Sequence, residues 1–362
     1  MQVAVHVGQL LQRVPGGIGR YVSHLVGALP EAGVDVVALA AGPRPPEVHG
    51  PYVDLGWPRG PLRYEAWARL RRPVPDVAGA VLHATSLAVP PPAHRPLVVT
   101  VHDLVFLRHP EYLTPRGVSF HRRGLELARR EAAAVVVPTA FGRDELVAEG
   151  FEVERVHVAH HGVAVPAPPL TDREAGEAAL RRLGVSTPFV LFVGTLEPRK
   201  GIVDLVAAHR VLRRTHPDLE LVLAGSPGWG AVPDLSGPGI VALGPAHDDD
   251  LDALYRAAVA LALPSRYEGF GLPVLEAMAR GAAVVTSDAA SLVEVAGGVA
   301  ERVEAGDVDA LAGALDRLAS DPDHRRRLGA AGRVHASHFS WSGSAEAHAL
   351  AYRGALQARG GG

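Results

Sequence analysis

The sequence contains no cysteine, and it has no long apolar run. The absence of cysteine excludes disulfides, thiolate metal sites and cysteine nucleophiles, and it is compatible with a reducing cytoplasm. No apolar run approaches the roughly 20 residues that a membrane-spanning helix needs. Residues 1–7 are typical of a first β-strand and lack the pattern of a signal peptide. We therefore expect a cytoplasmic protein that at most touches the inner face of a membrane peripherally.

A basic charge excess is also missing. The formal net charge is −3 and the sequence pI is about 6.7, which argues against a nucleic-acid-binding protein, because such proteins usually carry a strongly basic face. The 18 histidines are scattered and show no convincing metal-ligand spacing. The length of 362 residues predicts about two domains.

Short β-like runs alternate with helical patterns along most of the chain, which is typical of parallel sheets built from βαβ units. The expected strands lie near 2–7, 34–40, 80–84, 97–101, 133–137, 155–159, 188–194, 219–224, 239–242, 259–263 and 282–286. The expected helices lie near 17–29, 117–131, 139–149, 201–215, 248–257 and 271–280. Three more helical segments are expected beyond Asp307, the last of them at about 342–358. A proline-rich stretch at 164–170 predicts a linker between two α/β domains.

The most informative segment is the stretch 265–278, Ser-Arg-Tyr-Glu-Gly-Phe-Gly-Leu-Pro-Val-Leu-Glu-Ala-Met. It follows an apolar strand and enters a helix with Pro273 in the first turn, where proline is tolerated best. Amide groups at the start of this helix carry the positive end of its dipole, so they favour an anion such as a diphosphate. Glu268 and Glu276 flank these amides, and carboxylates accept hydrogen bonds from sugar or ribose hydroxyls. The segment predicts a sugar-nucleotide site.

The Glu-Gly-Phe-Gly-Leu-Pro-Val-Leu-Glu-Ala-Met segment resembles the retaining glycosyltransferases of family four, glycosyl transferases group 1, which have the GT-B fold. This resemblance implies an α/β protein with two Rossmann-like domains that face each other across a cleft. It implies an acceptor domain at 1–168 completed by the C-terminal helix at about 342–358, and a donor domain at 169–341. It implies that Glu276 contacts the ribose, and that Glu268 and the backbone of Gly269, Phe270, Gly271 and Leu272 contact the sugar and the phosphates.

A second motif, Gly-Thr-Leu-Glu-Pro-Arg-Lys-Gly at 194–201, follows the first strand of the second half. Arg199 and Lys200 are candidate diphosphate clamps, because a leaving nucleoside diphosphate gains negative charge that the protein must neutralise without a metal. The motif resembles the corresponding loop of mannosyltransferase-like members of the family. Many relatives carry arginine where this chain has Thr195, so Lys200 is the stronger of the two candidates.

Two motifs of the first half complete the candidate site. Gly16 and Gly17 lie between the first strand and the first helix, where glycine lets the backbone approach a phosphate closely. His102 and Asp103 end a strand at the edge where open α/β sheets bind ligands. The resemblance implies that the glycines reach over the donor phosphates, that His102 contacts the sugar or the acceptor hydroxyl, and that Asp103 orients the ring or meets the acceptor.

Three other groups have simpler explanations. The acidic run 248–250 predicts an N-terminal cap and first helical turn rather than a metal motif. The arginines at 122–123 and 129–130 predict a solvated helix face, although an anionic membrane or acceptor is an alternative. His160 and His161 resemble the family's segment that closes the first domain, and we interpret them as structural.

The sequence thus predicts a metal-independent, retaining transferase with no cofactor. It would move a hexose from a nucleotide sugar, with GDP-mannose preferred and UDP-glucose an alternative, to an unknown acceptor such as a glycan, a lipid-linked glycan or a small molecule. The alternatives are a UDP-sugar epimerase of the same fold and a non-catalytic sugar-nucleotide-binding protein. A dinucleotide-dependent oxidoreductase is disfavoured, because no Gly-x-Gly-x-x-Gly motif follows the first strand.

Overall fold

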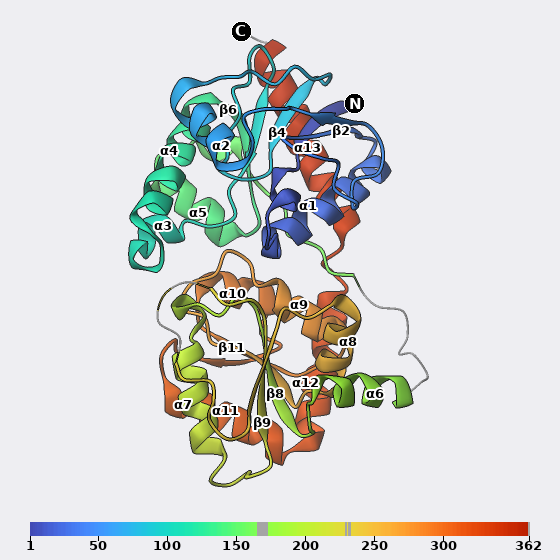
Figure 1. Ribbon diagram of the computed structural model, residues 1–362, viewed down its shortest axis with the longest axis vertical. Coiled ribbons are helices and arrows are strands. Elements are labelled where there is room, and N and C mark those ends of the chain that lie inside the picture. Colours follow the sequence, from blue (N-terminus) through green and yellow to red (C-terminus); the bar gives the residue numbers. More distant parts are fainter. Residues whose placement is uncertain (165–172, 229, 231–232, 361–362) are drawn as a thin grey trace. The chain divides into compact units, whose positions relative to one another are not determined.

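The computed structural model describes residues 1–164, 173–228, 230 and 233–360, and the chain divides into two compact units (Figure 1). Unit 1 comprises Met1–Gly162 and Ser340–Gly362, and unit 2 comprises Val163–Phe339. The expected linker at 164–170 lies almost entirely outside the described residues. Each unit contains one parallel sheet with helices on its faces, so the α/β fold class predicted from the alternation of strands and helices is confirmed.

Unit 1 has a seven-stranded sheet in the order β3-β2-β1-β4-β5-β6-β7, in which every pairing is parallel. Its strands are β1 (Gln2–His6), β2 (Asp35–Ala40), β3 (Tyr52–Asp54), β4 (Val81–Ala84), β5 (Leu97–Thr100), β6 (Ala132–Val137) and β7 (Val156–Val158). Its helices are α1 (Gly16–Ala28), α2 (Gly60–Leu70), α3 (Val105–Arg108), α4 (Pro115–Glu131), α5 (Ala140–Ala148) and α13 (Trp341–Gly360), with short 3-10 turns at Gly8–Leu11, Leu29–Ala32, Pro110–Tyr112 and Val153–Arg155. The strand β3 and the helices α2 and α3 were not predicted from the sequence.

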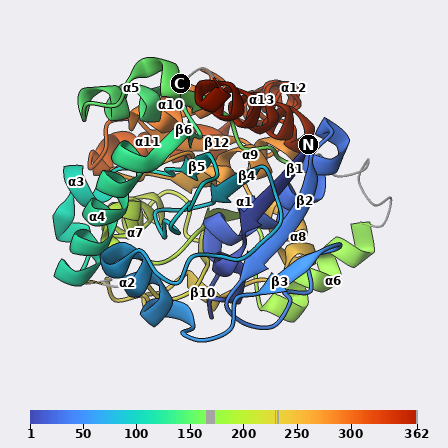
Figure 2. The ribbon, with the colours of Figure 1, turned by 90° about the horizontal axis from the view of Figure 1, so that it is seen from above.

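Side chains of the unit 1 sheet alternate between two cores, as the two-residue period of a strand requires. Val3 and Val5 of β1 point into one core with α1 and α13, whereas Ala4 between them points into the other core, to which α4 contributes. Figure 2 shows α13 and α4 on opposite sides of the strands β4, β5 and β6. Because both faces are covered, the strands read as continuous apolar runs in the sequence.

Helix α13 packs against β6, β5 and β4 of unit 1, beside α1, although it is the last element of the chain (Figure 1). Its buried face includes Tyr352 and His348, both fully inaccessible to solvent. Tyr352 Oη lies 2.8 Å from His83 Nδ1 of β4, and Tyr21 Oη of α1 lies 2.8 Å from His348 Nε2. Polar side chains therefore anchor this helix in a core that is otherwise apolar.

The hydrogen bonds of this buried network have one consistent direction when both imidazoles are neutral. His348 Nδ1 must donate to the carbonyl oxygen of Ser344, which lies 2.7 Å away, because a carbonyl oxygen can only accept. His348 Nε2 therefore accepts from Tyr21. Tyr21 then accepts from the Thr100 hydroxyl at 2.9 Å, and His83 Nε2 donates to Thr100 at 2.8 Å. His83 Nδ1 is left to accept from the tyrosine of α13. Burial lowers the pKa of His348 to about 4, which keeps its ring neutral at pH 7.

Unit 2 has a six-stranded parallel sheet in the order β10-β9-β8-β11-β12-β13. Its strands are β8 (Phe189–Val193), β9 (Glu220–Ala224), β10 (Ile240–Gly244), β11 (Ala260–Leu263), β12 (Val284–Ser287) and β13 (Glu301–Val303). Its helices are α6 (Arg173–Leu183), α7 (Ile202–Leu212), α8 (Asp248–Ala257), α9 (Leu272–Ala279), α10 (Ala290–Ala296), α11 (Val308–Ser320) and α12 (Pro322–Ala336), with a 3-10 turn at Pro198–Lys200. The strand β13 and the helices α6 and α10 were not predicted from the sequence.

The strand order places a topological switch point in each sheet. The order reverses between β1 and β4 in unit 1 and between β8 and β11 in unit 2, and open α/β sheets bind ligands beyond the carboxyl ends of the strands at such points. In unit 2 the segment after β8 carries Arg199 and Lys200, and the segment after β11 carries Glu268. The fold therefore brings the two motifs of the second half to one place, although 68 residues separate Lys200 from Glu268.

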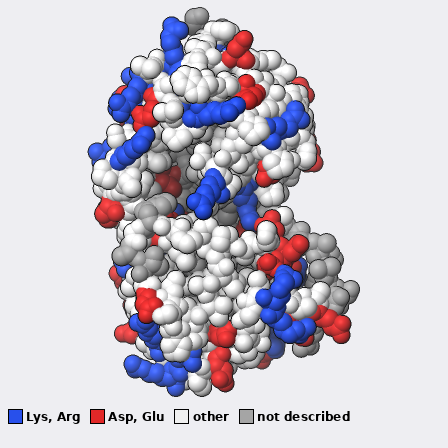
Figure 3. Space-filling view, viewed as in Figure 1, with Lys and Arg blue, Asp and Glu red and all other residues white. Residues whose placement is uncertain are grey.

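The surface carries both signs of charge. On the face shown in Figure 3, acidic and basic side chains are interspersed on each unit. Among the described residues, no helix is both long enough and apolar enough to cross a bilayer.

Candidate functional site

The centre of the unit 2 site is a buried ion-pair cluster. Lys200 Nζ donates to Glu268 Oε1, and Arg199 Nη1 lies 3.2 Å from Glu268 Oε2. Ser265 Oγ donates to the same Oε1 at 2.8 Å. The side chains of Lys200 and Glu268 are only 11% and 7% exposed, so their attraction is weakly screened by water.

Glu197 is a fourth member of this cluster, which the sequence analysis did not single out. Its Oε1 lies 2.7 Å from Arg199 Nε, and its side chain is 2% exposed. The guanidinium of Arg199 thus bridges two carboxylates, those of Glu197 and Glu268. The sequence signal that could have identified Glu197 is its position in the same short turn as the cation Arg199, two residues before it.

The cluster shifts the pKa values of its carboxylates in opposite directions. Burial alone would raise the pKa of Glu268, but the charges of Lys200 and Arg199 and the hydrogen bonds outweigh burial, and the pKa falls to about 2. Burial raises the pKa of Glu197, because its single ion pair with Arg199 compensates burial only in part. Burial also lowers the pKa of Lys200, an effect that Glu268 opposes.

Lys200 is the only lysine of the chain, which the sequence analysis also overlooked. Every other long basic side chain is arginine. The one lysine is placed in a 3-10 turn at the switch point of the sheet and is buried against a glutamate. A lysine ammonium is a compact, strongly hydrated point charge, which a guanidinium does not replace. A single lysine in a chain that otherwise uses arginine is therefore a sequence signal for a site that requires such a charge.

The segment after β11 leads into α9 through Gly271. Its φ of +99° lies in the left-handed region, and a Cβ here would lie 2.5 Å from Leu292 Cδ2. Pro273 lies in the first turn of α9, as predicted. Gly269 precedes this turn, and the side chains of Phe270 and Leu272 are buried.

Glu276 is buried inside α9, one turn after its start, and is 6% exposed. Tyr255 of α8 donates to Glu276 Oε2 at 2.8 Å, and Arg280 donates to the backbone oxygen of Glu276 at 3.0 Å. The Arg280 guanidinium also lies over the Tyr255 ring at 5.3 Å. These contacts fix the position of the carboxylate.

In unit 1 the structure places the predicted residues at the same kind of edge. Gly16, with φ of +62°, begins α1 after β1, and His102 and Asp103 follow β5. Within the described chain, a Cβ on Gly16 or Gly17 would meet nothing within 4 Å, whereas one on Gly19 would lie 2.3 Å from Pro15 Cβ. Packing therefore requires glycine at 19 but not at 17.

His102 has a defined tautomer. Its Nε2 lies 2.9 Å from the carbonyl oxygen of Thr85, which can only accept, so Nε2 carries the proton and Nδ1 is the acceptor of the neutral ring. Burial lowers the pKa of His102, which favours this neutral form. The ring packs edge-on against Tyr21 at 4.9 Å between centroids. Asp103 Oδ1 accepts from the Val105 amide at 3.2 Å and so caps the turn that follows.

The remaining groups agree with their structural interpretations. The acidic run 248–250 forms the first turn of α8 after His247 at the N-cap, and the described residues include no cluster of three or more His, Asp or Glu side chains that could hold a metal ion. His161 is buried and its ring lies 4.7 Å from that of Tyr21.

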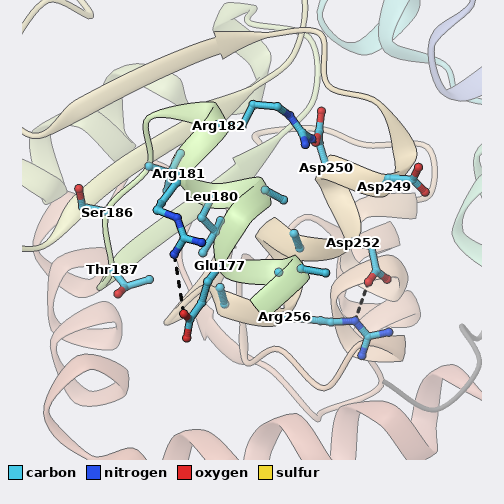
Figure 4. A pocket seen from close by; sticks show the side chains of 16 residues that line it. Glu177, Leu180, Arg181, Arg182, Ser186, Thr187, Asp249, Asp250, Asp252 and Arg256 are labelled. Atoms are coloured by element: carbon cyan, nitrogen blue, oxygen red, sulfur yellow. Dashed lines mark hydrogen bonds and ion pairs between the residues drawn. The ribbon is translucent and has the colours of Figure 1, made fainter. Parts of the chain in front are cut away.

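A hollow with a volume of about 1110 Å³ lies between α6 and α8 (Figure 4). None of the predicted site residues lines it. Its charged side chains pair with one another: Arg256 Nε with Asp252 at 2.6 Å, Arg182 with Asp250, and Arg181 with Glu177 at 3.8 Å. With Asp249, which also lines the hollow, the acidic side chains outnumber the arginines, so the lining does not favour an anionic nucleotide and the chemistry points to the switch point instead.

Comparison with known proteins gives the same assignment for both units. Residues 15–166 match the family model Glycosyltransferase Family 4, and residues 181–335 match Glycosyl transferases group 1. The O-antigen chain mannosyltransferase B of Escherichia coli is 31% identical over 288 residues, which cover 77% of this chain and 74% of that protein. The alpha-maltose-1-phosphate synthase of Mycolicibacterium smegmatis is 33% identical over 289 residues, covering 71% and 73%.

Solved structures show the same fold. Sucrose-phosphate synthase from Thermosynechococcus elongatus has a TM-score of 0.73 at 23% identity and covers 98% of both chains. Anabaena Alr3699/HepE, in complex with UDP and glucose, has a TM-score of 0.75 at 19% identity and covers 97% of this chain and 98% of its own. Together with the two family models, these matches confirm the predicted fold and family: the chain is a GT-B glycosyltransferase of family 4.

Proposed function

We propose that this glycosyltransferase moves a hexose from a nucleoside diphosphate sugar to an acceptor hydroxyl, with retention of anomeric configuration and without a metal ion. The observation that carries the proposal is the buried pair of cations, Arg199 and Lys200, at the switch point of unit 2. A departing nucleoside diphosphate gains negative charge, and prearranged cations in a poorly screened site stabilise that charge most effectively.

In this proposal the residues of unit 2 bind the donor. Lys200 and Arg199 contact the diphosphate, together with the backbone of Gly269, Phe270, Gly271 and Leu272 at the start of α9. Glu276, held by Tyr255, accepts hydrogen bonds from the ribose hydroxyls. The carboxylate of Glu268 contacts the transferred sugar while its ion pairs hold it in place.

The residues of unit 1 bind the acceptor and the reacting end of the donor. Gly16 and Gly17 let a phosphate or sugar approach the backbone, which is supported by the open space where their side chains would be. His102 accepts a hydrogen bond from a sugar or acceptor hydroxyl at Nδ1, since Nε2 is engaged by Thr85. Asp103 positions the turn after His102 through its bond to the Val105 amide.

Mannose from GDP-mannose is the donor we prefer. The Gly-Thr-Leu-Glu-Pro-Arg-Lys loop supports it, as do two relatives whose names describe mannosyltransferases: the Escherichia coli protein and the MMP alpha-(1->4)-mannosyltransferase of Mycolicibacterium hassiacum, which is 32% identical. UDP-glucose is the second candidate, favoured by the structural likeness to Anabaena Alr3699/HepE with bound UDP-glucose.

The test is a panel of nucleotide sugars incubated with the purified protein, with and without EDTA, while release of nucleoside diphosphate is measured. We expect slow hydrolysis of one donor, unaffected by EDTA and abolished in Lys200→Met. Arg317→Met, which removes an exposed arginine of unit 2, is the matched control and should retain activity. Epimerised sugar released without transfer would instead support the epimerase, and binding without turnover would support a sugar-nucleotide-binding protein.

A further inference from the structure

The cluster of unit 2 is electrically balanced before any ligand binds. Two cations, Arg199 and Lys200, face two carboxylates, Glu197 and Glu268. All four side chains are 17% exposed or less. The sugar nucleotide that the proposed function places here adds two negative charges, one on each phosphate. The site would then hold four negative charges against two positive ones in a medium that screens them poorly.

One carboxylate of the cluster is much less well compensated than the other. Glu268 receives Lys200 and Ser265 on Oε1 and Arg199 on Oε2. Glu197 receives only Arg199 Nε on Oε1, while its Oε2 is fully buried and no described residue donates a hydrogen bond to it. A buried carboxylate oxygen without a donor is costly in the ionised form, and protonation removes that cost.

The other groups around Glu197 do not relieve this imbalance. The charged groups that act on it are Arg199 and Lys200 from its own turn and Glu268 from the segment before α9. The loop after β9 packs against it at Gly228, and the charged side chain among the described residues of this loop, Asp234, is exposed and accepts hydrogen bonds from Ser236. A ligand anion at the two cations weakens the attraction that keeps Glu197 ionised.

We propose that Glu197 is a proton-linked group of the donor site: binding of the sugar nucleotide draws one proton from the solvent onto Glu197 Oε2. This inference rests on the proposed function, since it takes the diphosphate to bind at Arg199 and Lys200. The proton comes from the buffer, and no other bond forms or breaks. Donor affinity then falls as pH rises, by up to about tenfold per pH unit in the range where free Glu197 is ionised and bound Glu197 is protonated.

Burial already raises the pKa of Glu197 in the free protein, which is the direction that favours proton uptake. The same cluster holds the pKa of Glu268 down at about 2, which makes Glu268 a poor competitor for the proton. Glutamine at position 197 keeps the shape of the protonated acid and cannot titrate. The Glu197→Gln variant therefore mimics the bound state.

Isothermal titration calorimetry of the full chain measures this uptake directly. UDP-glucose and GDP-mannose are each titrated in buffers of different ionisation enthalpy between pH 5.5 and 8.5. Both phosphates of these donors are esterified, so the ligand itself does not titrate in this range. For the donor that binds, we expect uptake of up to about one proton per site, which decreases at the acid end where Glu197 is already protonated.

In Glu197→Gln the uptake should disappear and the affinity should lose its pH dependence, while the melting temperature shows that the variant is folded. Glu304→Gln, an exposed glutamate of unit 2, is the control and should take up protons as the wild type does. If the donor binds but no proton uptake is measured at any pH, the inference is overturned and the proposed function stays intact. Undiminished uptake in Glu197→Gln would also overturn the inference and would assign the proton to another group. No binding of either donor would contradict the proposed function itself, and with it this inference.

Discussion

Replacing Lys200 by methionine should destabilise unit 2 strongly, because it leaves the carboxylate of Glu268 buried without its principal cation. Glu268 is 6% exposed, and its pKa falls from 4.5 to about 2 in the folded protein. A difference of that size corresponds to about 3 kcal/mol of stability at about 1.4 kcal/mol per pKa unit. Breaking a buried ion pair by removing one partner costs a comparable amount, about 3–5 kcal/mol.

Differential scanning calorimetry of the full chain tests this prediction. For a unit of this size, 1 kcal/mol shifts the melting temperature by about 2–4 °C, so Lys200→Met should lower the unit 2 transition by roughly 6–12 °C. The exposed control Arg317→Met removes an ion pair with Glu301 and should shift it by about 2 °C or less. Replacing Glu268 as well, in Lys200→Met/Glu268→Met, should recover part of the loss, because two apolar side chains leave no buried charge.

The pH dependence of the same transition provides a second check. The folded pKa of Glu268 lies below its unfolded value, so its contribution is fully present above pH 4.5 and is lost as pH falls toward 2. The difference in unit 2 melting temperature between wild type and Lys200→Met should therefore decrease as pH falls from 4.5 toward 2. A Lys200→Met protein that melts within 2 °C of wild type at pH 7 would refute the reasoning, because the ion pair would then contribute no more than an exposed one.

Four further predictions follow from single contacts. Gly271→Ala should cost about 1–3 kcal/mol, measured by thermal melting, because its φ is +99° and the new Cβ would contact Leu292; Gly176→Ala, in an open helical position, should be neutral or slightly stabilising. Tyr255→Phe should raise the KM for the donor several-fold and also lower the melting temperature of unit 2, because buried Glu276 loses the hydroxyl that donates to it and orients it; equal KM values would contradict this. Tyr352→Phe should destabilise unit 1 by about 1–3 kcal/mol in calorimetry, since it removes a buried hydrogen-bond donor; an unchanged transition would show that the network adds no stability. Unit 1 should lose stability as pH falls from 6.5 to 4, because the pKa of buried His348 is about 4 in the folded chain and the unfolded chain binds the proton first; a flat profile over that range would contradict the neutral network.

Parts of this structure that depend on local sequence were predictable. The buried strands of both sheets are continuous apolar runs, and each predicted strand lies within about two residues of its observed bounds. Most of the missed elements are short or weakly patterned: β3 and β13 have three residues each, α3 has four, α10 has seven, and α2 is weakly amphipathic around the buried Arg63 and Trp67. The helix α6 was also missed, although it is amphipathic. A short edge strand carries too few residues for its period to be recognised.

The motifs of the site were also readable from sequence, because Gly271 and Pro273 have local conformational roles. What sequence did not provide is the contact between segments. The ion pair of Lys200 with Glu268 depends on β8 and β11 being neighbours at a switch point, and the buried second carboxylate, Glu197, appears only once that turn is packed. The network between α13 and the strands of unit 1 likewise joins residues more than 200 positions apart, Tyr352 and His83.

The most direct test of the account uses the single lysine as a probe. Protein labelled with 13C at lysine Cε should show one lysine side-chain signal, that of Lys200, in a two-dimensional NMR spectrum. The account predicts that this signal shifts on saturation with the donor nucleotide sugar, that the free sugar leaves it unchanged, and that the spectrum of Glu276→Gln responds only at higher donor concentration. A donor that binds and turns over while the Lys200 signal stays unchanged would contradict the placement of the diphosphate at this site.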